Sequence, residues 1–381
     1  MFITILIFII VLGVLVLAHE FGHFIVAKRT GMKVEEFGFG FPPRVFGVQR
    51  SGGKFRWVWG HKEPKNKEAT VYSLNWIPFG GFVKIMGENN EREEDPRSFV
   101  NRPAWARFLT LAAGVSMNWI LAAVLFSLTF MIGVTSEFDL SEPAFKGATV
   151  TNQQIAIGYI AEGMPAQQAG LQIGDIVLSV DGKTFDNMSD LQNYIKSNKG
   201  QTFDFKVKRV NKTEDLQVSS QANPKEGEGP TGIGLTEVGT VRLPFFQSIS
   251  LGVAKAANMT VAIIYGIYHI FTTNQIAQNV GGPVKIAQLT GEMASLGFTT
   301  LLSFMGLLSI NLAILNALPL PALDGGRILF LAIEKIRRKR NNQRIEQWVN
   351  AAGFMALIFL MILVTAKDVG LGKLIGKMFG G

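Results

Sequence analysis

The sequence predicts a polytopic α-helical membrane protein with four transmembrane helices, a membrane-associated β-hairpin loop and an inserted α+β domain. Hydrophobic residues make up 48% of the 381 residues and charged residues only 17%, which is more apolar than the core of a soluble protein requires. The apolar residues also gather into runs that are long enough to cross a bilayer as helices. Lysine and arginine concentrate in the loops between these runs.

Four apolar runs are predicted to span the membrane. The first, within residues 1–28, opens with the uncharged stretch MFITILIFIIVLGVLVLA. It lacks the basic start and the cleavage site of a signal peptide, so we expect a retained anchor. The other three spans occupy residues 104–134, 300–332 and 348–366. An even number of spans places both termini on the same side of the membrane.

Charge bias in the loops predicts the orientation of the chain. Residues 28–107 hold 15 basic and 9 acidic residues, and residues 333–347 hold six basic residues, whereas residues 134–298 hold 12 basic and 15 acidic residues. Because loops rich in lysine and arginine stay in the cytoplasm, we expect both termini and the middle segment to be extracytoplasmic. The net charge of +8 reflects this bias and does not indicate a nucleic-acid partner. The chain has no cysteine, which excludes disulfides and Cys-ligated zinc.

The cytoplasmic loop at residues 29–103 is predicted to contain short strands. Its stretches VEEFGFGFPPRVFGV and ATVYSLNWIPFGGFVKIMGE alternate aromatic and aliphatic residues with glycine, a pattern typical of strands joined by hairpin turns. The second stretch contains Gly80, Gly81 and Phe82 and is apolar enough to lie against the bilayer. We therefore expect a membrane-associated β-hairpin loop here.

The middle segment contains one predicted soluble domain, at residues 150–222. Strand-like runs alternate there with one amphipathic helix at residues 188–197. The stretch AGLQIGDIVLSVDGK resembles the core of a PDZ domain, a fold that usually captures an extended peptide at a sheet edge. A peptide ligand is one interpretation, and a β-rich spacer that binds no peptide is the other.

Residues 223–299 are predicted to form a linker and an interfacial amphipathic helix. The run SLGVAKAANMTVAIIYGIYHIF, at residues 250–271, resembles a fifth span in composition. If it crossed the membrane, the span at 300–332 would reverse, and its polar residues could not meet those of the first span. We therefore expect this helix to lie in the interface or to re-enter the membrane.

The first span ends with the motif His19-Glu20-Phe21-Gly22-His23. Residues four apart share one face of a helix, so both imidazoles can bind a single zinc ion. Glu20 can then reach a metal-bound water and accept its proton. The alternative is a set of polar residues facing the lipid headgroups. However, the apolar run continues to Lys28, and ionisable residues inside the membrane boundary usually mark function.

Asp324 is the candidate for a third zinc ligand, which a catalytic zinc site usually has beside an open position for water. It is the only acidic residue of the span at 300–332. Pro319 and Pro321 interrupt the helix before it, and irregular backbone at membrane depth occurs where protein or a water-filled cavity covers it. Asn316, just before the break, could donate a hydrogen bond to a substrate carbonyl. The alternative for Asp324 is a helix cap beside a glycine pair.

The motif HEFGH on the first span and the stretch NALPLPALDGG on the third resemble the site-2 protease family of intramembrane zinc metalloproteases. The stretches FGFGFPP, IPFGGFVKIMGE, AGVSMNWILA, VGGPVKIAQ and GFMALIFLMILVTAKDV also match the family. Four spans with one external PDZ domain are similar to the bacterial RseP and RasP type, some members of which carry two PDZ domains. The resemblance implies that His19, His23 and Asp324 are zinc ligands and that Glu20 is the general base.

The resemblance also implies residues that position the substrate. Asn316 matches an asparagine thought to help hold the substrate. Gly80, Gly81 and Phe82 fall in FGGFVK, which matches a membrane-associated β-loop proposed to pair with an extended substrate strand.

The resemblance further implies partners and a location. The substrates would be single-span membrane proteins, either anti-sigma factors already trimmed by another protease or remnant signal peptides. The PDZ domain would act as a gate on the outer face, and the active site would lie near the cytoplasmic side of the bacterial inner membrane, within the lipid bilayer.

Two other functions are consistent with parts of the sequence. One is a membrane PDZ scaffold with a structural zinc site, although a structural site needs no base such as Glu20. The other is a metal or solute transporter, which would need polar residues at several depths of the membrane rather than at one.

Overall fold

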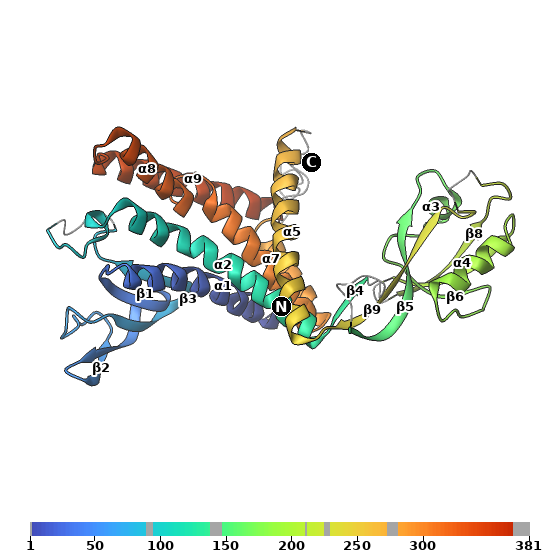
Figure 1. The fold of residues 1–381 in the computed structure, drawn as a ribbon, viewed down its shortest axis with the longest axis horizontal. Coiled ribbons are helices and arrows are strands. Elements are labelled where there is room, and N and C mark those ends of the chain that lie inside the picture. Colours follow the sequence, from blue (N-terminus) through green and yellow to red (C-terminus); the bar gives the residue numbers. More distant parts are fainter. Residues whose placement is uncertain are drawn as a thin grey trace, which may run out of the picture. The chain divides into compact units, whose positions relative to one another are not determined.

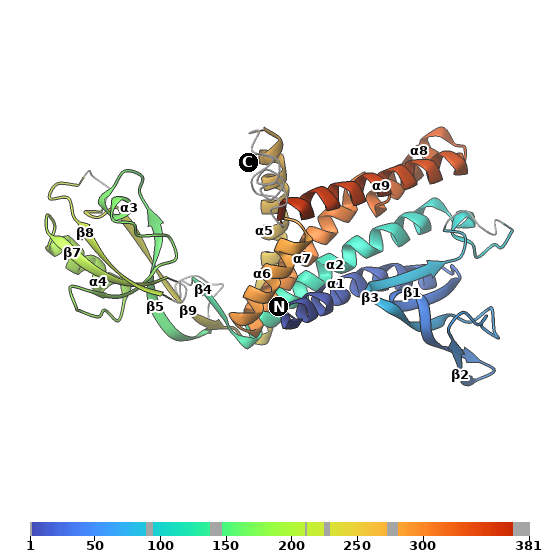
Figure 2. The ribbon, with the colours of Figure 1, turned by 180° about the vertical axis from the view of Figure 1, so that it is seen from behind.

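The computed structural model describes residues 2–88, 94–137, 147–209, 212–224, 229–272 and 281–368. The chain divides into two compact units. We call residues 1–128 with 252–381 the helical unit, and residues 129–251 the β-rich unit. Figure 1 shows their elements, and Figure 2 shows the same ribbon from behind.

Long helices form most of the helical unit. Their bounds are α1 (Phe2–Arg29), α2 (Ala104–Ile132), α5 (Phe245–Thr272), α6 (Pro283–Ser295), α7 (Phe298–Ala317), α8 (Asp324–Arg337) and α9 (Gln343–Asp368), and a short 3-10 turn at Phe99–Asn101 precedes α2. Helices α1, α2 and α7 share a buried cluster that includes Leu15, Leu125 and Leu302. This cluster holds the helix that carries the HEFGH motif against two neighbours.

Five helices of the described chain are long and apolar enough to cross a membrane. They are α1, α2, α7, residues Phe245–His269 of α5 and residues Arg344–Asp368 of α9, and they identify a membrane protein. The count of four spans stays a prediction, because length and apolarity alone do not exclude α5. In both views α5 crosses the direction of α1, α2 and α7 steeply, and Ala256 of α5 packs with Phe126 of α2 and Ile310 of α7.

The structure divides the span predicted over residues 300–332 into two helices, with the break at the predicted prolines. Helix α7 ends at Ala317, and α8 begins at Asp324. Pro319 and Pro321 lie in the connection and cannot continue a regular helix, and Ala322 adopts a left-handed conformation with φ of 70°. Asp324 is therefore the first residue of a new helix rather than an interior residue of a span.

Within residues 29–103, the described residues form a three-stranded sheet in the order β2-β1-β3. Its strands are β1 (Val34–Ser51), β2 (Lys54–Trp59) and β3 (Val71–Ile85). The outer part of β1 pairs with β2 in a hairpin, and its inner part pairs with the end of β3, where Phe37 lies opposite Val83. The end of β3 runs along α1, so the expected strands lie beside the helix with the HEFGH motif.

The β-rich unit contains a six-stranded sheet in the order β4-β9-β5-β6-β7-β8. The strands are β4 (Val134–Glu137), β5 (Thr149–Ile160), β6 (Ile176–Val180), β7 (Thr202–Arg209), β8 (Lys212–Ser219) and β9 (Ile233–Arg242), with helices α3 (Pro165–Gln168) and α4 (Met188–Ser197). Helix α4 has the bounds that its amphipathic pattern predicted. Leu191 and Ile195 of α4 pack on Phe203 and Phe205 of β7 in the core.

The boundary expected at residue 222 is wrong, because the sheet continues into the predicted linker. Strand β9 pairs with β5 on one side and with β4 on the other. Gly234 and Gly239 interrupt the alternation of apolar and polar residues that usually identifies a strand in a sequence. In the structure, most side chains of β9 are half-buried.

Candidate active site

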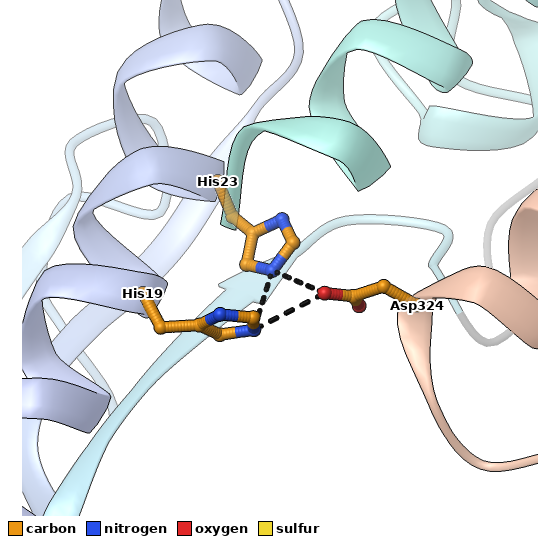
Figure 3. Close-up of side chains that lie close together, drawn as sticks. All are labelled: His19, His23 and Asp324. Atoms are coloured by element: carbon orange, nitrogen blue, oxygen red, sulfur yellow. Dashed lines mark hydrogen bonds and ion pairs between the residues drawn. The ribbon is translucent and has the colours of Figure 1, made fainter. Parts of the chain in front are cut away.

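His19, His23 and Asp324 converge in the helical unit (Figure 3). The two histidines lie one turn apart on α1, and Asp324 begins α8. Oδ2 of Asp324 lies 3.1 Å from Nε2 of His19 and 3.3 Å from Nε2 of His23, and the two Nε2 atoms are 3.2 Å apart. Residues about 300 positions apart in the chain thus present three ligand atoms to one point.

The spacing of these atoms fits a zinc ion. Ligand atoms about 2.0–2.1 Å from a tetrahedral zinc lie roughly 3.3–3.4 Å from one another, and the three measured separations are 3.1, 3.2 and 3.3 Å. Two imidazoles and one carboxylate also form a usual donor set for catalytic zinc, with a fourth position left for water or substrate. The three side chains are therefore suited to hold zinc.

Two glycines allow α1 and α2 to approach closely at the site. A Cβ on Gly22, within HEFGH, would lie 2.3 Å from the carbonyl oxygen of Ala113 on α2. A Cβ on Gly114 would lie 2.3 Å from Nε2 of His23 and 2.7 Å from Cε1 of His19. Small residues at helix crossings permit such contacts in membranes, and here the imidazole rings occupy the space.

Helix α2 also orients both imidazoles. Nδ1 of His23 lies 2.7 Å from the carbonyl oxygen of Thr110, so Nδ1 must carry the proton and donate it. In the neutral imidazole, Nε2 of His23 is then unprotonated and free to bind metal.

The Asn118 side chain lies against the other imidazole, with its Nδ2 atom 3.3 Å from Nδ1 of His19. Within the described chain, Oδ1 of Asn118 is buried without a hydrogen-bond partner. A half-turn of the amide would let Oδ1 accept the Nδ1 proton of His19, which satisfies this oxygen and frees Nε2 for metal.

Asp324 owes its position to the glycine pair that follows it. Cβ atoms on Gly325 and Gly326 would lie 2.3 Å from the carbonyl oxygen of Ala317 and 2.1 Å from that of Leu320. The connection after α7 can therefore fold tightly onto the first turn of α8. The side chain of Asn350 on α9 accepts a hydrogen bond from the backbone N–H of Ala322 at 3.1 Å, which fixes the approach to Asp324.

Glu20 faces the same site and contacts the sheet. Its Oε2 accepts a hydrogen bond of 3.1 Å from the backbone N–H of Val83 on β3. Glu20 also lines the same cavity as the three candidate ligands, where its carboxylate can exchange protons with a water molecule.

A cavity of about 580 Å³ contains the site. Of the predicted residues, Phe82 and Asn316 line this cavity together with Glu20 and the three candidate ligands. Gly80 and Gly81 instead lie against α1, where their Cβ atoms would come within 2.6 Å of Val16 and 3.1 Å of Leu17. They bring the end of β3 to the cavity without lining it.

Residues of α2 were missing from the predicted site. Thr110, Gly114 and Asn118 contact the histidines, and the last two flank the stretch VSM in AGVSMNWILA. A polar asparagine within an apolar span was the available signal. Arg327 on α8 was also missed, and its ion pair with Glu88 joins the segment after β3 to the helix of Asp324.

Comparisons with known proteins agree with this geometry. The sequence profile of peptidase family M50 matches residues 7–59 and 62–360. A Clostridium perfringens protein provisionally described as a zinc metalloprotease is 33% identical, with coverage of 93% of this chain and 95% of that protein. The regulator of sigma-W protease RasP of Bacillus subtilis is 28% identical, with coverage of 96% and 98%.

A solved structure also matches part of the chain. The PDZ domain of an SdrC-like protein from Listeria monocytogenes is 28% identical over 23% of this chain and 92% of that domain, with a TM-score of 0.21.

Proposed function

The chain belongs to peptidase family M50, the site-2 protease family, and is a zinc metalloprotease, and from this premise we propose that it hydrolyses a peptide bond within the membrane-spanning segment of single-span proteins. The main support is that His19, His23 and Asp324 converge in the cavity that Glu20 also lines. Helix α1, which carries both histidines, is long and apolar enough to cross a bilayer. A protease site at this depth acts on substrates that share the membrane.

We assign the chemical roles from the positions of the side chains. His19, His23 and Asp324 would hold zinc, which would supply Lewis-acid polarisation of the scissile carbonyl and lower the pKa of the attacking water. Glu20 accepts the proton of that water and returns it to the leaving nitrogen. Asn316, on the wall of the cavity, donates a hydrogen bond to a substrate carbonyl.

The end of β3 holds the substrate in an extended form. A helical substrate hides its carbonyls in hydrogen bonds and must unwind before attack. Phe82 and Val83 line the cavity, and the N–H of Val83 points away from β1 towards Glu20. This edge can add an unwound substrate as a further strand.

The substrate class follows from the family and its relatives. We propose that it comprises anti-sigma factors trimmed beforehand or remnant signal peptides, in regulated intramembrane proteolysis. The name of the Bacillus subtilis relative, a regulator of sigma-W, supports the first. The charge bias of the loops supports a site near the cytoplasmic side of the bacterial inner membrane, with the PDZ-like unit and both termini outside.

The test compares Glu20→Gln with the unchanged protein in detergent, using a single-span model substrate. The variant should keep its zinc, because Glu20 is not a ligand, and should lose cleavage by at least about 100-fold. Glu35→Gln is the matched control, because Glu35 lines the same cavity but pairs with Lys84 and does not belong to the cluster of candidate ligands. Mass spectrometry should place the cut within the apolar segment. Undiminished cleavage by Glu20→Gln, or a cut outside that segment, would refute the proposal.

A further inference from the structure

The hairpin of β1 and β2 presents an exposed aromatic surface. Phe55, Trp57 and Trp59 alternate along β2 with exposed fractions of 77%, 62% and 56%. The Phe46 ring lies 5.6 Å from the Trp57 ring and 5.9 Å from the Trp59 ring. We call these four residues the aromatic face. Large aromatic side chains gathered in this way on a monomer usually mark a binding surface.

This face continues a surface that already packs against a membrane-spanning helix. Residues opposite each other in a sheet share a face, and Val48 lies opposite both Trp57 and Tyr72. The ring of Tyr72 in turn lies 5.9 Å from the ring of Phe24 on α1. One face of the sheet therefore runs from under α1 to the uncovered hairpin.

The contact with Phe24 also gives the depth of the face. Phe24 lies about one turn before Lys28 and Arg29, the basic residues that end α1 and mark the headgroup level. In Figures 1 and 2 the hairpin extends sideways from this end of α1 instead of continuing along its axis. The aromatic face thus lies at the level where tryptophan rings favour the membrane interface.

The segment that carries the face is strongly basic. Residues 44–67 contain seven lysines and arginines and a single acidic residue, Glu63. Arg44 pairs with Glu36, and Lys67 pairs with Glu63. The other five cations are exposed: Arg50, Lys54, Arg56, Lys62 and Lys65. Clusters of this size beside a membrane-spanning helix attract anionic lipid headgroups.

The alternation of the two residue types fits a ribbon lying within the interface. Lys54 and Arg56 project from the opposite side of β2 from Phe55 and Trp57, because side chains alternate along a strand. Arg50 lies opposite Phe55 and so shares the side of the rings. The headgroup layer on each side of a bilayer is about 5–8 Å thick, so one layer of lipid can receive the rings together with the cations on both sides of the hairpin. Long basic side chains reach phosphates readily from such positions.

From these observations we propose that the β1–β2 hairpin is an anionic-lipid-binding element, with the aromatic face inserted into the leaflet beside the end of α1 and the five exposed cations bound to headgroup phosphates. The proposal rests on the membrane embedding that the proposed function requires. It adds the lipid class that the hairpin recognises and the residues that recognise it.

The chain contains no cysteine, so a single introduced cysteine can carry an environment-sensitive probe. We would label Phe55→Cys in the full-length protein and reconstitute it in nanodiscs of phosphatidylcholine, with or without phosphatidylglycerol. Lys206→Cys, at an exposed position of β7, is the control site. Acrylamide, which is uncharged, serves as the aqueous quencher.

The expected result is a blue shift and a several-fold lower quenching constant at position 55 in the anionic nanodiscs than in the neutral ones. High salt should abolish this difference between anionic and neutral nanodiscs. The triple variant Arg50→Gln, Lys54→Gln, Arg56→Gln should abolish it as well. The matched control removes three exposed lysines of the β-rich unit instead, Lys196, Lys199 and Lys208, and should change nothing.

Three results would overturn the proposal. The probe at position 55 could be as accessible as the probe at position 206 in both lipids, or protected equally in both. It could also be protected only when RNA or a soluble protein is added. Zinc content and substrate cleavage, measured on the same samples, report separately on the catalytic proposal, so either proposal can fail without the other.

Discussion

A Cβ atom on Gly114 of α2 would lie 2.3 Å from Nε2 of His23. Helix α2 contributes no candidate zinc ligand, yet its backbone limits where the two imidazoles can lie. Thr110 and Asn118, one turn before and one turn after Gly114, hold the outer nitrogens of the rings. The metal site is therefore built on three helices, although its candidate ligands come from two.

Replacement of Gly114 by alanine should reduce zinc binding. The added methyl group must displace both rings, and changes beside metal ligands typically cost about 10- to 100-fold in metal affinity. Gly266→Ala is the matched control, because a Cβ on this helical glycine of α5 would have no atom within 4 Å. Zinc content of the purified proteins, measured by mass spectrometry, checks the prediction. Equal zinc in both variants would contradict it.

Substitutions of Asn118 should distinguish the two orientations of its amide. If Oδ1 accepts the Nδ1 proton of His19, Asn118→Asp keeps an acceptor there and should retain zinc, whereas Asn118→Leu should lose about 10- to 100-fold in affinity. If Nδ2 instead donates to Nδ1, aspartate should be as damaging as leucine. Zinc titration against a competing chelator measures the difference.

Gly80→Ala should impair cleavage more than zinc binding. Gly80 has a φ of 87°, which costs an alanine about 1–2 kcal/mol, and its Cβ would lie 2.6 Å from Val16 of α1. The end of β3 must then move away from Glu20. Gly53→Ala shares the unfavourable φ, at 75°, but has open space around it. A comparison of cleavage rates and zinc content should show a loss of rate in Gly80→Ala alone.

Asp175 should make the β-rich unit more stable near neutral pH than in acid. Burial of its carboxyl group opposes ionisation, but hydrogen bonds from Arg209 and from the backbone N–H of Gln172 outweigh this effect and lower its pKa. The pKa in the unfolded chain is about 3.9. The stabilisation is therefore complete above that value and is lost as the pH falls through the lower folded-state pKa.

The variant Asp175→Asn should therefore destabilise the unit by about 1–3 kcal/mol near neutral pH, and the difference from the unchanged protein should shrink in acid. The free energy of unfolding of the unit can be measured by urea titration with pulse proteolysis of the full-length protein, with thermolysin near neutral pH and pepsin in acid. Asp186→Asn, at an exposed position, should have little effect. A difference for Asp175→Asn that is constant with pH would refute the assignment.

Local patterns in the sequence were sufficient for several parts of the molecule. The spacing of His19 and His23 predicted a shared helical face, and the structure places both Nε2 atoms 3.2 Å apart. The amphipathic pattern of residues 188–197 predicted α4 with its observed bounds. These features depend on the period of a single helix, which neighbouring residues already express.

Other features depend on contacts between distant residues. The proline pair predicted a break before Asp324, but the position of α8 follows from Gly325 and Gly326 packing against carbonyls of the preceding connection. The residues of β9 were predicted to be a linker, because only their pairing with β4 and β5 in the folded protein identifies them as a strand.

The amino-acid pattern of the chain was enough to indicate a membrane-embedded zinc site and its candidate ligands, because ligand chemistry and helical period are local properties. The partners of those ligands could be found only in three dimensions. Thr110 lies 87 residues from His23, and Asn118 lies 99 residues from His19. No periodicity links such pairs, and it is the packing of α1 against α2 that brings them together.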